Sequence, residues 1–309
     1  MTVSLVTGGA GFIGSHIVRA LLARGDDVKV LDNFSTGKRA NINDLEGVLE
    51  IHEGDLRDAS LVADLVRDVD YIFHHAAFVS VPLSIEDPQS CFDVNVQGTV
   101  NLLESARNTG VQHVVLASSA AVYGDSGNYP LREDTPLTFL SPYAASKHTN
   151  ESYANLYSRI SEMGVTALRY FNIYGPRQSP DSSYAAAIPI FARRMLDGEA
   201  PIINGDGLQS RDFVFVDDVV RANLLAAENA EAAGQVYNIC TGHEISILDL
   251  VNTLAEIIPH TLQPQFVAPR FGDIYRSLGD PQLAENILGF KPQISLLDGL
   301  RQTVAWMQS

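Results

Sequence analysis

The segment TGGAGFIG, residues 7–14, constrains the fold of this chain more than any other. It follows a short apolar run, SLV, and precedes apolar residues at helical spacing that begin with Ile13. Gly8, Gly11 and Gly14 let the backbone turn tightly and approach a pyrophosphate, whose charge the amides and dipole of a helix N-terminus favour. The order of strand, glycine turn and helix therefore indicates a dinucleotide site, with a merely tight turn as the alternative.

Short apolar runs alternate with helical patterns through the first half of the chain: VKVLD, VLEIHEGD, DYIFHHAA, HVVLASS and TALRYFN. These runs lack polar alternation, so we expect an α/β fold with a doubly wound, Rossmann-type parallel sheet buried on both faces. Prolines interrupt the pattern after Asn172, until DFVFV, a helical segment and VYNIC restore it. We therefore predict a Rossmann domain over 1–170 plus about 212–240. A smaller α/β substrate-binding domain is predicted over about 171–211 and 241–309.

Charge and composition narrow the classes of function. The chain has 309 residues and a formal net charge of −16, so it lacks the basic face that nucleic acids and anionic membranes require. No stretch reaches the roughly 18 apolar residues of a membrane span, and the first residues lack the pattern of a signal peptide. We therefore expect a cytoplasmic protein with neither a nucleic-acid nor a membrane partner.

No metal site is predicted. The two cysteines, Cys91 and Cys240, lie far apart and match no metal spacing, so we interpret them as small buried side chains. The adjacent His74 and His75 have no evident third ligand, which favours a structural role for both.

An acid ends the second predicted strand, Asp32 in VKVLDNFSTG. A carboxylate there accepts hydrogen bonds from a ribose 2′-hydroxyl and repels a 2′-phosphate, which favours NAD over NADP. Asp55 follows the third strand, where an adenine ring could be contacted, although a surface turn acid fits the spacing nearly as well. The small Ala76 and Ala77 follow the fourth strand, where a cofactor would pass close to the backbone.

A tyrosine and a lysine stand four residues apart in SPYAASK, downstream of the strand that ends in SSAAVYG. Pro142 after a Ser141 cap suits a helix start, so Tyr143 and Lys147 should share one helix face. A nearby cation favours phenolate, and the positive nicotinamide of an oxidised cofactor would add to this, so we predict that the pKa of Tyr143 falls from about 10 toward the working pH. Tyr143 would then act as a general base for a hydroxyl proton.

TGGAGFIG, the acid in LDN, SSAAVYG, YAASK and RYFNIYGPRQ together resemble the extended short-chain dehydrogenase/reductase superfamily over essentially the whole chain. INGDGLQSRDFVFVDD and SSYAAAIP are similar to the nucleotide-sugar 4-epimerases that act on UDP-hexoses and UDP-N-acetylhexosamines. The resemblance implies transient oxidation of the sugar at C4 by NAD, with Ser119, Tyr143 and Lys147 as catalytic residues. It leaves Ser118 a structural role.

The residues expected to hold NAD are Gly8, Gly11, Phe12, Ile13, Gly14, Asp32, Asn33, Ser35, Thr36, Gly37, Asp55, Leu56, Ala76, Ala77, Asn95, Tyr143, Lys147 and Tyr170. Those expected to hold the UDP-sugar are Ser80, Ser119, Tyr143, Asn172, Arg211, Arg270, Asp273 and Ser277. The resemblance also implies a homodimer that pairs through helices around 93–107 and 147–161.

Two details bear on which reaction and which sugar are favoured. Related dehydratases and decarboxylases carry a carboxylate just after the serine motif, where this chain has Ala120 and Ala121, so an epimerase is favoured. Ser277 occupies the position where a small residue admits a 2-acetamido group, unless it simply fills a loop. Val79 replaces a lysine that contacts the cofactor in some of these epimerases. The alternatives are another NAD-dependent nucleotide-sugar epimerase, a dehydratase, a reductase, or a catalytically silent NAD-binding regulator.

Overall fold

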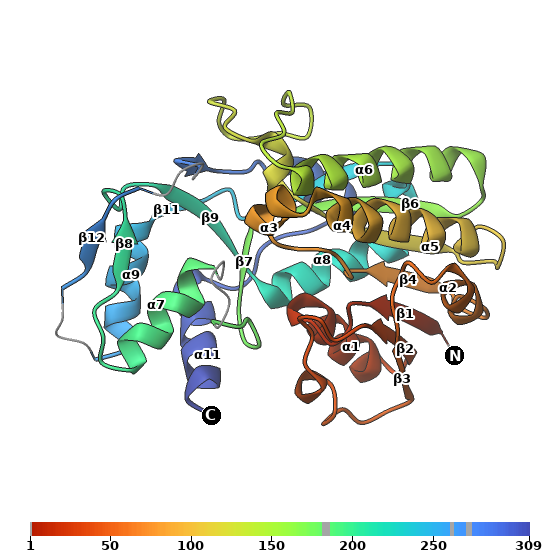
Figure 1. The fold of residues 1–309 in the computed structure, drawn as a ribbon, viewed down its shortest axis with the longest axis horizontal. Coiled ribbons are helices and arrows are strands. Elements are labelled where there is room, and N and C mark those ends of the chain that lie inside the picture. Colours follow the sequence, from red (N-terminus) through yellow and green to blue (C-terminus); the bar gives the residue numbers. More distant parts are fainter. Residues whose placement is uncertain (1, 181–185, 260–262, 270–273) are drawn as a thin grey trace.

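The structure is a computed structural model that describes residues 2–180, 186–259, 263–269 and 274–309. A large sheet with helices on both faces lies beside a smaller group of strands and helices, which includes the C-terminal helix (Figure 1). Within the described residues, no helix is both long enough and apolar enough to cross a membrane.

The large sheet contains seven strands that are all parallel. They are β1 (Val3–Thr7), β2 (Asp27–Asp32), β3 (Leu49–Glu53), β4 (Tyr71–His74), β5 (His113–Ser119), β6 (Gly164–Tyr170) and β10 (Val236–Ile239). Their order is β3-β2-β1-β4-β5-β6-β10, so the order reverses between β1 and β4. This confirms the doubly wound Rossmann-type sheet, in which ligands bind at the carboxyl ends of the strands beside the reversal.

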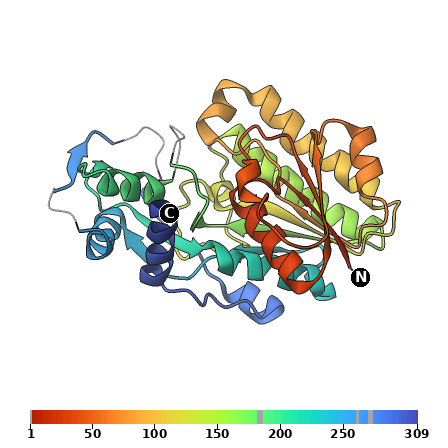
Figure 2. The ribbon, with the colours of Figure 1, turned by 90° about the horizontal axis from the view of Figure 1, so that it is seen from below.

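Helices cover both faces of this sheet (Figure 2). One face packs against α2 (Ala59–Leu65), α5 (Gly98–Ala106) and α6 (Pro142–Ile160), and the other against α1 (Phe12–Arg24), α8 (Val216–Glu228) and α10 (Gln282–Leu288). Two short helices, α3 (Val81–Glu86) and α4 (Pro88–Phe92), and a π-helical stretch (Asp93–Gln97) lead from β4 into α5. Single 3-10 turns lie at Arg39–Asn41, Ala120–Tyr123 and Ala230–Ala232.

The smaller group has its own hydrophobic core. Its four-stranded sheet contains β7 (Asn172–Tyr174), β9 (Ser210–Phe215), β11 (Glu244–Ser246) and β13 (Arg276–Ser277), and β8 (Ile202–Asn204) pairs with β12 (Gln265–Val267). Helices α7 (Ala187–Leu196), α9 (Ile247–Ile257) and α11 (Leu296–Gln308) pack around these strands.

The segment DFVFV differs from its predicted place. We expected the chain to rejoin the Rossmann domain at about 212, but β9 pairs with β7, β11 and β13 in the small sheet. Helix α8 and strand β10 return to the large sheet, as expected. Helix α10, predicted in the smaller domain, also packs against the large sheet. A strand that is buried on both faces has the same apolar pattern in either sheet, so the pattern alone does not identify its partners.

Candidate active site

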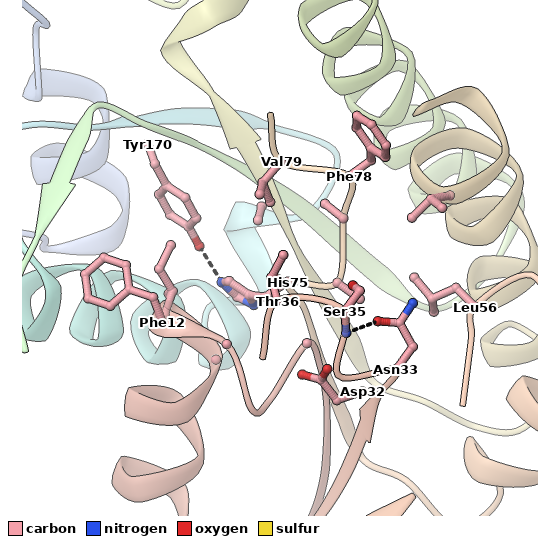
Figure 3. Close-up of a pocket in the computed structure, with 18 of the residues that line it drawn as sticks. Phe12, Asp32, Asn33, Ser35, Thr36, Leu56, His75, Phe78, Val79 and Tyr170 are labelled. Atoms are coloured by element: carbon pink, nitrogen blue, oxygen red, sulfur yellow. Dashed lines mark hydrogen bonds between the residues drawn. The ribbon is translucent and has the colours of Figure 1, made fainter. Parts of the chain in front are cut away.

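A cavity of about 580 Å³ opens at the carboxyl ends of the strands beside the reversal, within the size range of cofactor sites. It extends from the glycine turn after β1 to Tyr143 and Lys147 on α6, and Figure 3 shows a close-up of its lining side chains. Most of the predicted cofactor residues line it: Gly8, Gly11, Phe12, Ile13, Gly14, Asp32, Asn33, Ser35, Thr36, Asp55, Leu56, Ala76, Ala77, Tyr143, Lys147 and Tyr170. Ser119 lines it as well.

The glycine turn leaves space that no other residue type would leave. Gly8 has a φ of 68°, and a Cβ built on it would lie 2.6 Å from the backbone nitrogen of Ala76. A Cβ on Gly14 would lie 2.1 Å from the carbonyl oxygen of Gly8. Helix α1 begins beyond Gly11 without a side-chain cap, so its first amides face an open cavity. This cradle fits a pyrophosphate.

Asp32 lines the cavity next to the glycine turn and is 6% exposed. One carboxylate oxygen accepts a hydrogen bond from the Ala10 amide at 2.9 Å, and the other accepts one from the Phe34 amide at 2.8 Å. Each oxygen has a second acceptor site, which suits the two hydroxyls of a ribose. Gly37 does not line the cavity; a Cβ there would lie 2.8 Å from the Asp32 carboxylate, so it allows the loop to close around the acid.

Asp55 is fixed beside the segment that follows Asp32. Its carboxylate accepts hydrogen bonds from the Arg57 guanidinium at 2.8 and 2.9 Å and from the Asn33 amide at 3.0 Å. The hydrogen bonds from Arg57 hold the pKa of the Asp55 carboxyl well below its usual range. A charged acceptor therefore stands next to Leu56, where the adenine end of a dinucleotide is expected.

The three predicted catalytic residues meet at the end of β5. Ser141 caps α6 by accepting from the Ala144 amide at 3.2 Å, with Pro142 in the first turn, as the sequence predicts. The Ser119 side chain interacts with the Tyr143 phenol and favours its ionised form. The Lys147 ammonium donates to the carbonyl of Ala117 at 2.8 Å and lies 5.7 Å from the centre of the Tyr143 ring.

The electrostatics of Tyr143 differ from our prediction. Burial raises the pKa of Tyr143 from its ordinary value, and the hydrogen bond with Ser119 opposes that rise. Lys147 therefore does not produce the predicted fall, because removing the phenol from water outweighs the protein groups around it. The contribution expected from an oxidised nicotinamide stays a prediction. Burial also lowers the pKa of Lys147 to about 8, so its ammonium is held in a site that disfavours its charge.

The two histidines after β4 have separate hydrogen-bond partners. His74 is buried, with its ring nitrogens 2.7 Å from the Thr7 hydroxyl and 2.9 Å from the Thr99 hydroxyl. His75 lines the cavity, and its Nε2 lies 2.9 Å from the hydroxyl of Tyr170, as Figure 3 shows. Desolvation lowers the pKa of both rings to about 3. Both are therefore neutral at physiological pH.

Two predicted ligand contacts instead support the cavity wall. Asn95 is 1% exposed and does not line the cavity; its amide accepts from the Phe78 N–H at 2.7 Å and donates to Ser146 Oγ at 2.9 Å. Ser80 caps α3 by accepting from the Leu83 amide at 3.2 Å, and it too lies outside the lining. Both hold the segment that carries Phe78 and Val79, so their side chains are used for positioning.

Four predicted substrate residues in the described part of the chain, Ser80, Asn172, Arg211 and Ser277, are not among the residues that line this cavity. Arg211 on β9 pairs in register with Ser277 on β13, so the structure brings these two together. Asn172 on β7 donates to the carbonyl of Asp212 at 3.1 Å. Arg270 and Asp273 fall outside the described residues.

Several residues that line the cavity were not predicted. Among them are Lys38, Asn41, Phe78, Val79 and Arg177. Arg177 stands in the motif RYFNIYGPRQ, which was the signal available for it, and burial lowers the pKa of its guanidinium. Within the described part of the chain, no group of three histidine, cysteine or acidic side chains is placed to hold a metal ion.

Comparison with known proteins adds a family to this geometry. The family model described as NAD-dependent epimerase/dehydratase matches residues 4–240. A UDP-glucose 4-epimerase of Mycolicibacterium smegmatis is 41% identical over 310 residues, which cover 99% of this chain and 98% of that protein.

Solved structures are similar over the same length. The UDP-N-acetylglucosamine 4-epimerase of Methanobrevibacter ruminantium, in complex with UDP-N-acetylmuramic acid, superposes with a TM-score of 0.95 at 38% identity, covering 99% of this chain and 98% of that one. The UDP-glucose 4-epimerase of Thermotoga maritima, with UDP-glucose, gives a TM-score of 0.94 at 38% identity, covering 99% of both chains. A dTDP-glucose 4,6-dehydratase of Streptomyces venezuelae, with NAD bound, gives 0.90 at 39% identity, covering 99% of this chain and 97% of that one.

Proposed function

The chain belongs to the NAD-dependent epimerase/dehydratase family, and on that premise we propose that it is a UDP-sugar 4-epimerase. It would interconvert UDP-glucose with UDP-galactose, and UDP-GlcNAc with UDP-GalNAc. The observation that carries this proposal is the meeting of Ser119, Tyr143 and Lys147 at one end of a cavity whose other end holds the glycine cradle and Asp32.

NAD, when bound, would supply an acceptor and donor for the hydride at sugar C4, and the glycine cradle and Asp32 would hold it. The chain supplies the acid and base. Tyr143 would take the proton of the C4 hydroxyl at its phenolic oxygen and give it back after the sugar has turned. Ser119 would donate a hydrogen bond to the same sugar oxygen, and Lys147 would hold the nicotinamide ribose.

The two residues that follow Ser119 support epimerisation over elimination. A dehydratase must also remove a proton beside C4, which requires a further ionisable side chain. Here the residues after Ser119 are Ala120 and Ala121, and neither ionises. A dehydratase is the second candidate because the dTDP-glucose 4,6-dehydratase of Streptomyces venezuelae is so similar in fold.

The small residue at 277 supports a wide sugar range. Ser277 is partly buried on β13, beside Arg211 of β9. Arginine is well suited to clamp a diphosphate, since its guanidinium presents several donors to phosphate oxygens. A serine next to that clamp leaves room for a 2-acetamido group that a bulky residue would exclude.

We also propose that the protein is a homodimer, paired through α5, α6 and the segment before them. Phe92, Leu156 and Ile160 keep large apolar side chains 51%, 44% and 53% exposed on this side of the molecule. Covering such side chains is a common reason for association. Sedimentation of the wild type and of Leu156→Arg tests this, with a monomeric wild type as the contrary result. A cytoplasmic location stays a prediction.

The test of the reaction is direct. The purified protein is incubated separately with UDP-glucose, UDP-GlcNAc and UDP-glucuronate, and the products are resolved by chromatography. An equilibrating pair of 4-epimers supports the proposal, whereas net accumulation of NADH indicates a dehydrogenase. No conversion by a protein that retains NAD indicates a regulator.

Tyr143→Phe is the matched variant for this assay. It removes the phenolic oxygen but keeps the ring, so turnover should fall below detection while NAD still co-purifies. Full activity in Tyr143→Phe would refute the assignment of the base.

A further inference from the structure

Ser84 lies on the short helix α3 and has no exposed surface. Its hydroxyl donates to the carbonyl oxygen of Val81 at 2.6 Å and accepts from the backbone N–H of Tyr143 at 3.2 Å. Ser84 is therefore bonded to the backbone of a residue 59 positions away, at the start of α6. None of the sequence motifs assigned a role to Ser84.

The hydrogen bond from Tyr143 to Ser84 satisfies a backbone N–H group at the start of α6. The first N–H groups of an α-helix have no partner within it and must be satisfied from outside. In α6, Pro142 has no N–H, and Ser141 accepts from Ala144 with its side chain and from Ala145 with its carbonyl. The remaining N–H of the first turn is that of Tyr143, and Ser84 accepts from it.

The carbonyl of Tyr143 is held separately. Ser146 donates to it at 2.7 Å from within the same helix, and Ser146 accepts in turn from Asn95 at 2.9 Å. The two backbone polar atoms of Tyr143 are thus held from two sides. Loss of Ser84 would release the N–H side while the Asn95 contact stays intact.

We propose that Ser84 is a positioning residue for the phenol of Tyr143, an inference that rests on the function proposed above. Ser84 joins the first turn of α6 to α3, whose preceding segment, Phe78 and Val79, lines the cavity. Ser119 reaches the phenol from β5, on a different element. The bond between Tyr143 and Ser119 therefore depends on where the first turn of α6 sits, and Ser84 fixes that position.

The side chains that face the phenol set the direction of the effect. Lys147 faces it from α6, Cys91 from α4 and Ser119 from β5. Burial raises the pKa of Tyr143, Cys91 adds to the rise and the Ser119 hydrogen bond lowers it. A looser bond to Ser119 therefore leaves the phenol protonated up to a higher pH.

The experiment compares Ser84→Ala with the wild type, using kcat and KM for UDP-glucose, bound NAD and thermal unfolding. The rate of a catalysed step falls steeply when a reacting group is displaced by even a fraction of an ångström. Ser84→Ala should therefore lower kcat by about tenfold. KM and NAD content should change by less than about twofold, since most of the residues expected to hold the two ligands lie elsewhere in the site. The pH at which kcat is half-maximal should rise. Ser84→Thr keeps the hydroxyl and should recover most of the lost kcat.

Asp87→Ala is the control for a purely structural effect. Asp87 caps α4, next to α3, by accepting from the Ser90 amide at 3.0 Å, and it is exposed. It should lose a similar amount of thermal stability but keep the kcat and pH profile of the wild type. If Ser84→Ala also loses only stability, the proposal is wrong.

A wild type that converts no UDP-sugar would refute the proposed function but would leave Ser84 testable. The ionisation of Tyr143 is then measured by ultraviolet difference titration of each protein against its Tyr143→Phe counterpart. The phenol of Ser84→Ala should ionise at a higher pH than that of the wild type. Equal titration curves would overturn the positioning role.

Discussion

Replacing His113 with glutamine should make the fold less sensitive to acid. His113, at the start of β5, is 4% exposed, and its Nε2 lies 2.8 Å from the hydroxyl of Thr166. That hydroxyl donates to the carbonyl of Ala232 at 2.9 Å, so Nε2 must carry the ring hydrogen. Nδ1 lies against Gly164, where a Cβ would come within 2.5 Å of it. A second proton on the ring would have no partner there, and burial lowers the pKa of His113 to about 4.

The sign of the effect follows from the two states. The unfolded chain protonates this histidine near its ordinary pKa of 6.5, whereas the folded protein resists protonation until about pH 4. The contribution of His113 to the free energy of unfolding is therefore fully present above the pKa of the unfolded chain. It is lost as the pH falls from that pKa to the pKa of the folded protein. Each pH unit in that interval costs about 1.4 kcal/mol, so about 2 kcal/mol is lost by about pH 5.

The assay is urea unfolding of the NAD-loaded protein at about pH 7.5 and about pH 5, with His113→Gln beside the wild type. Glutamine does not titrate, so the variant should lose about 2 kcal/mol less between the two conditions. His243→Gln replaces an exposed histidine and serves as the control. Equal losses in wild type and His113→Gln would show that this ring does not resist protonation in the fold.

Three other substitutions test the site. Gly14→Ala would place a Cβ 2.1 Å from the carbonyl oxygen of Gly8, so this variant should purify with little NAD. The NAD content is measured by absorbance after denaturation. Gly25→Ala is the control, because a Cβ there meets open space, and it should keep its NAD. Asp32→Asn places an amide NH₂ group against a backbone N–H donor, which should lower the free energy of unfolding by about 1–3 kcal/mol. The variant should also bind NAD more weakly. Unchanged NAD binding by titration would contradict the role of Asp32. Ser277→Tyr should lose turnover of UDP-GlcNAc but keep that of UDP-glucose, and equal loss of both would count against a size filter at this position.

The parallel sheet could be predicted from the sequence because its strands are buried on both faces. The runs VKVLD and HVVLASS became β2 and β5, and the turn at Gly8 marks the strand reversal beside β1. The same property explains the error at β9, whose apolar pattern fits either sheet. Partner choice depends on contacts between distant segments, and no local pattern encodes them.

The site residues also differ in whether a local motif could predict them. Residues predicted from a short motif, such as Asp32 and Tyr143, line the cavity. Asn95 and Ser80 also stand in the expected segment, but their side chains are used by Phe78 and by the start of α3. Ser84 left no signal at all, because its hydrogen bond joins two helices that the sequence does not place side by side.

The raised pKa of Tyr143 changes which residue the chemistry depends on. The sequence suggested that the lysine lowers this pKa, but the ammonium of Lys147 is directed to the carbonyl of Ala117 and its own charge is disfavoured by burial. The hydrogen bond from Ser119 is the contact in the described structure that opposes the desolvation of the phenol. Burial that makes the phenolate costly also strengthens each hydrogen bond to it, because water no longer competes. The second serine of SSAAVYG therefore has two effects: it contacts the sugar oxygen in the proposed reaction, and it sets how readily Tyr143 gives up its proton. This makes the position of the phenol relative to β5, which Ser84 fixes from the other side, the geometric variable on which turnover should depend.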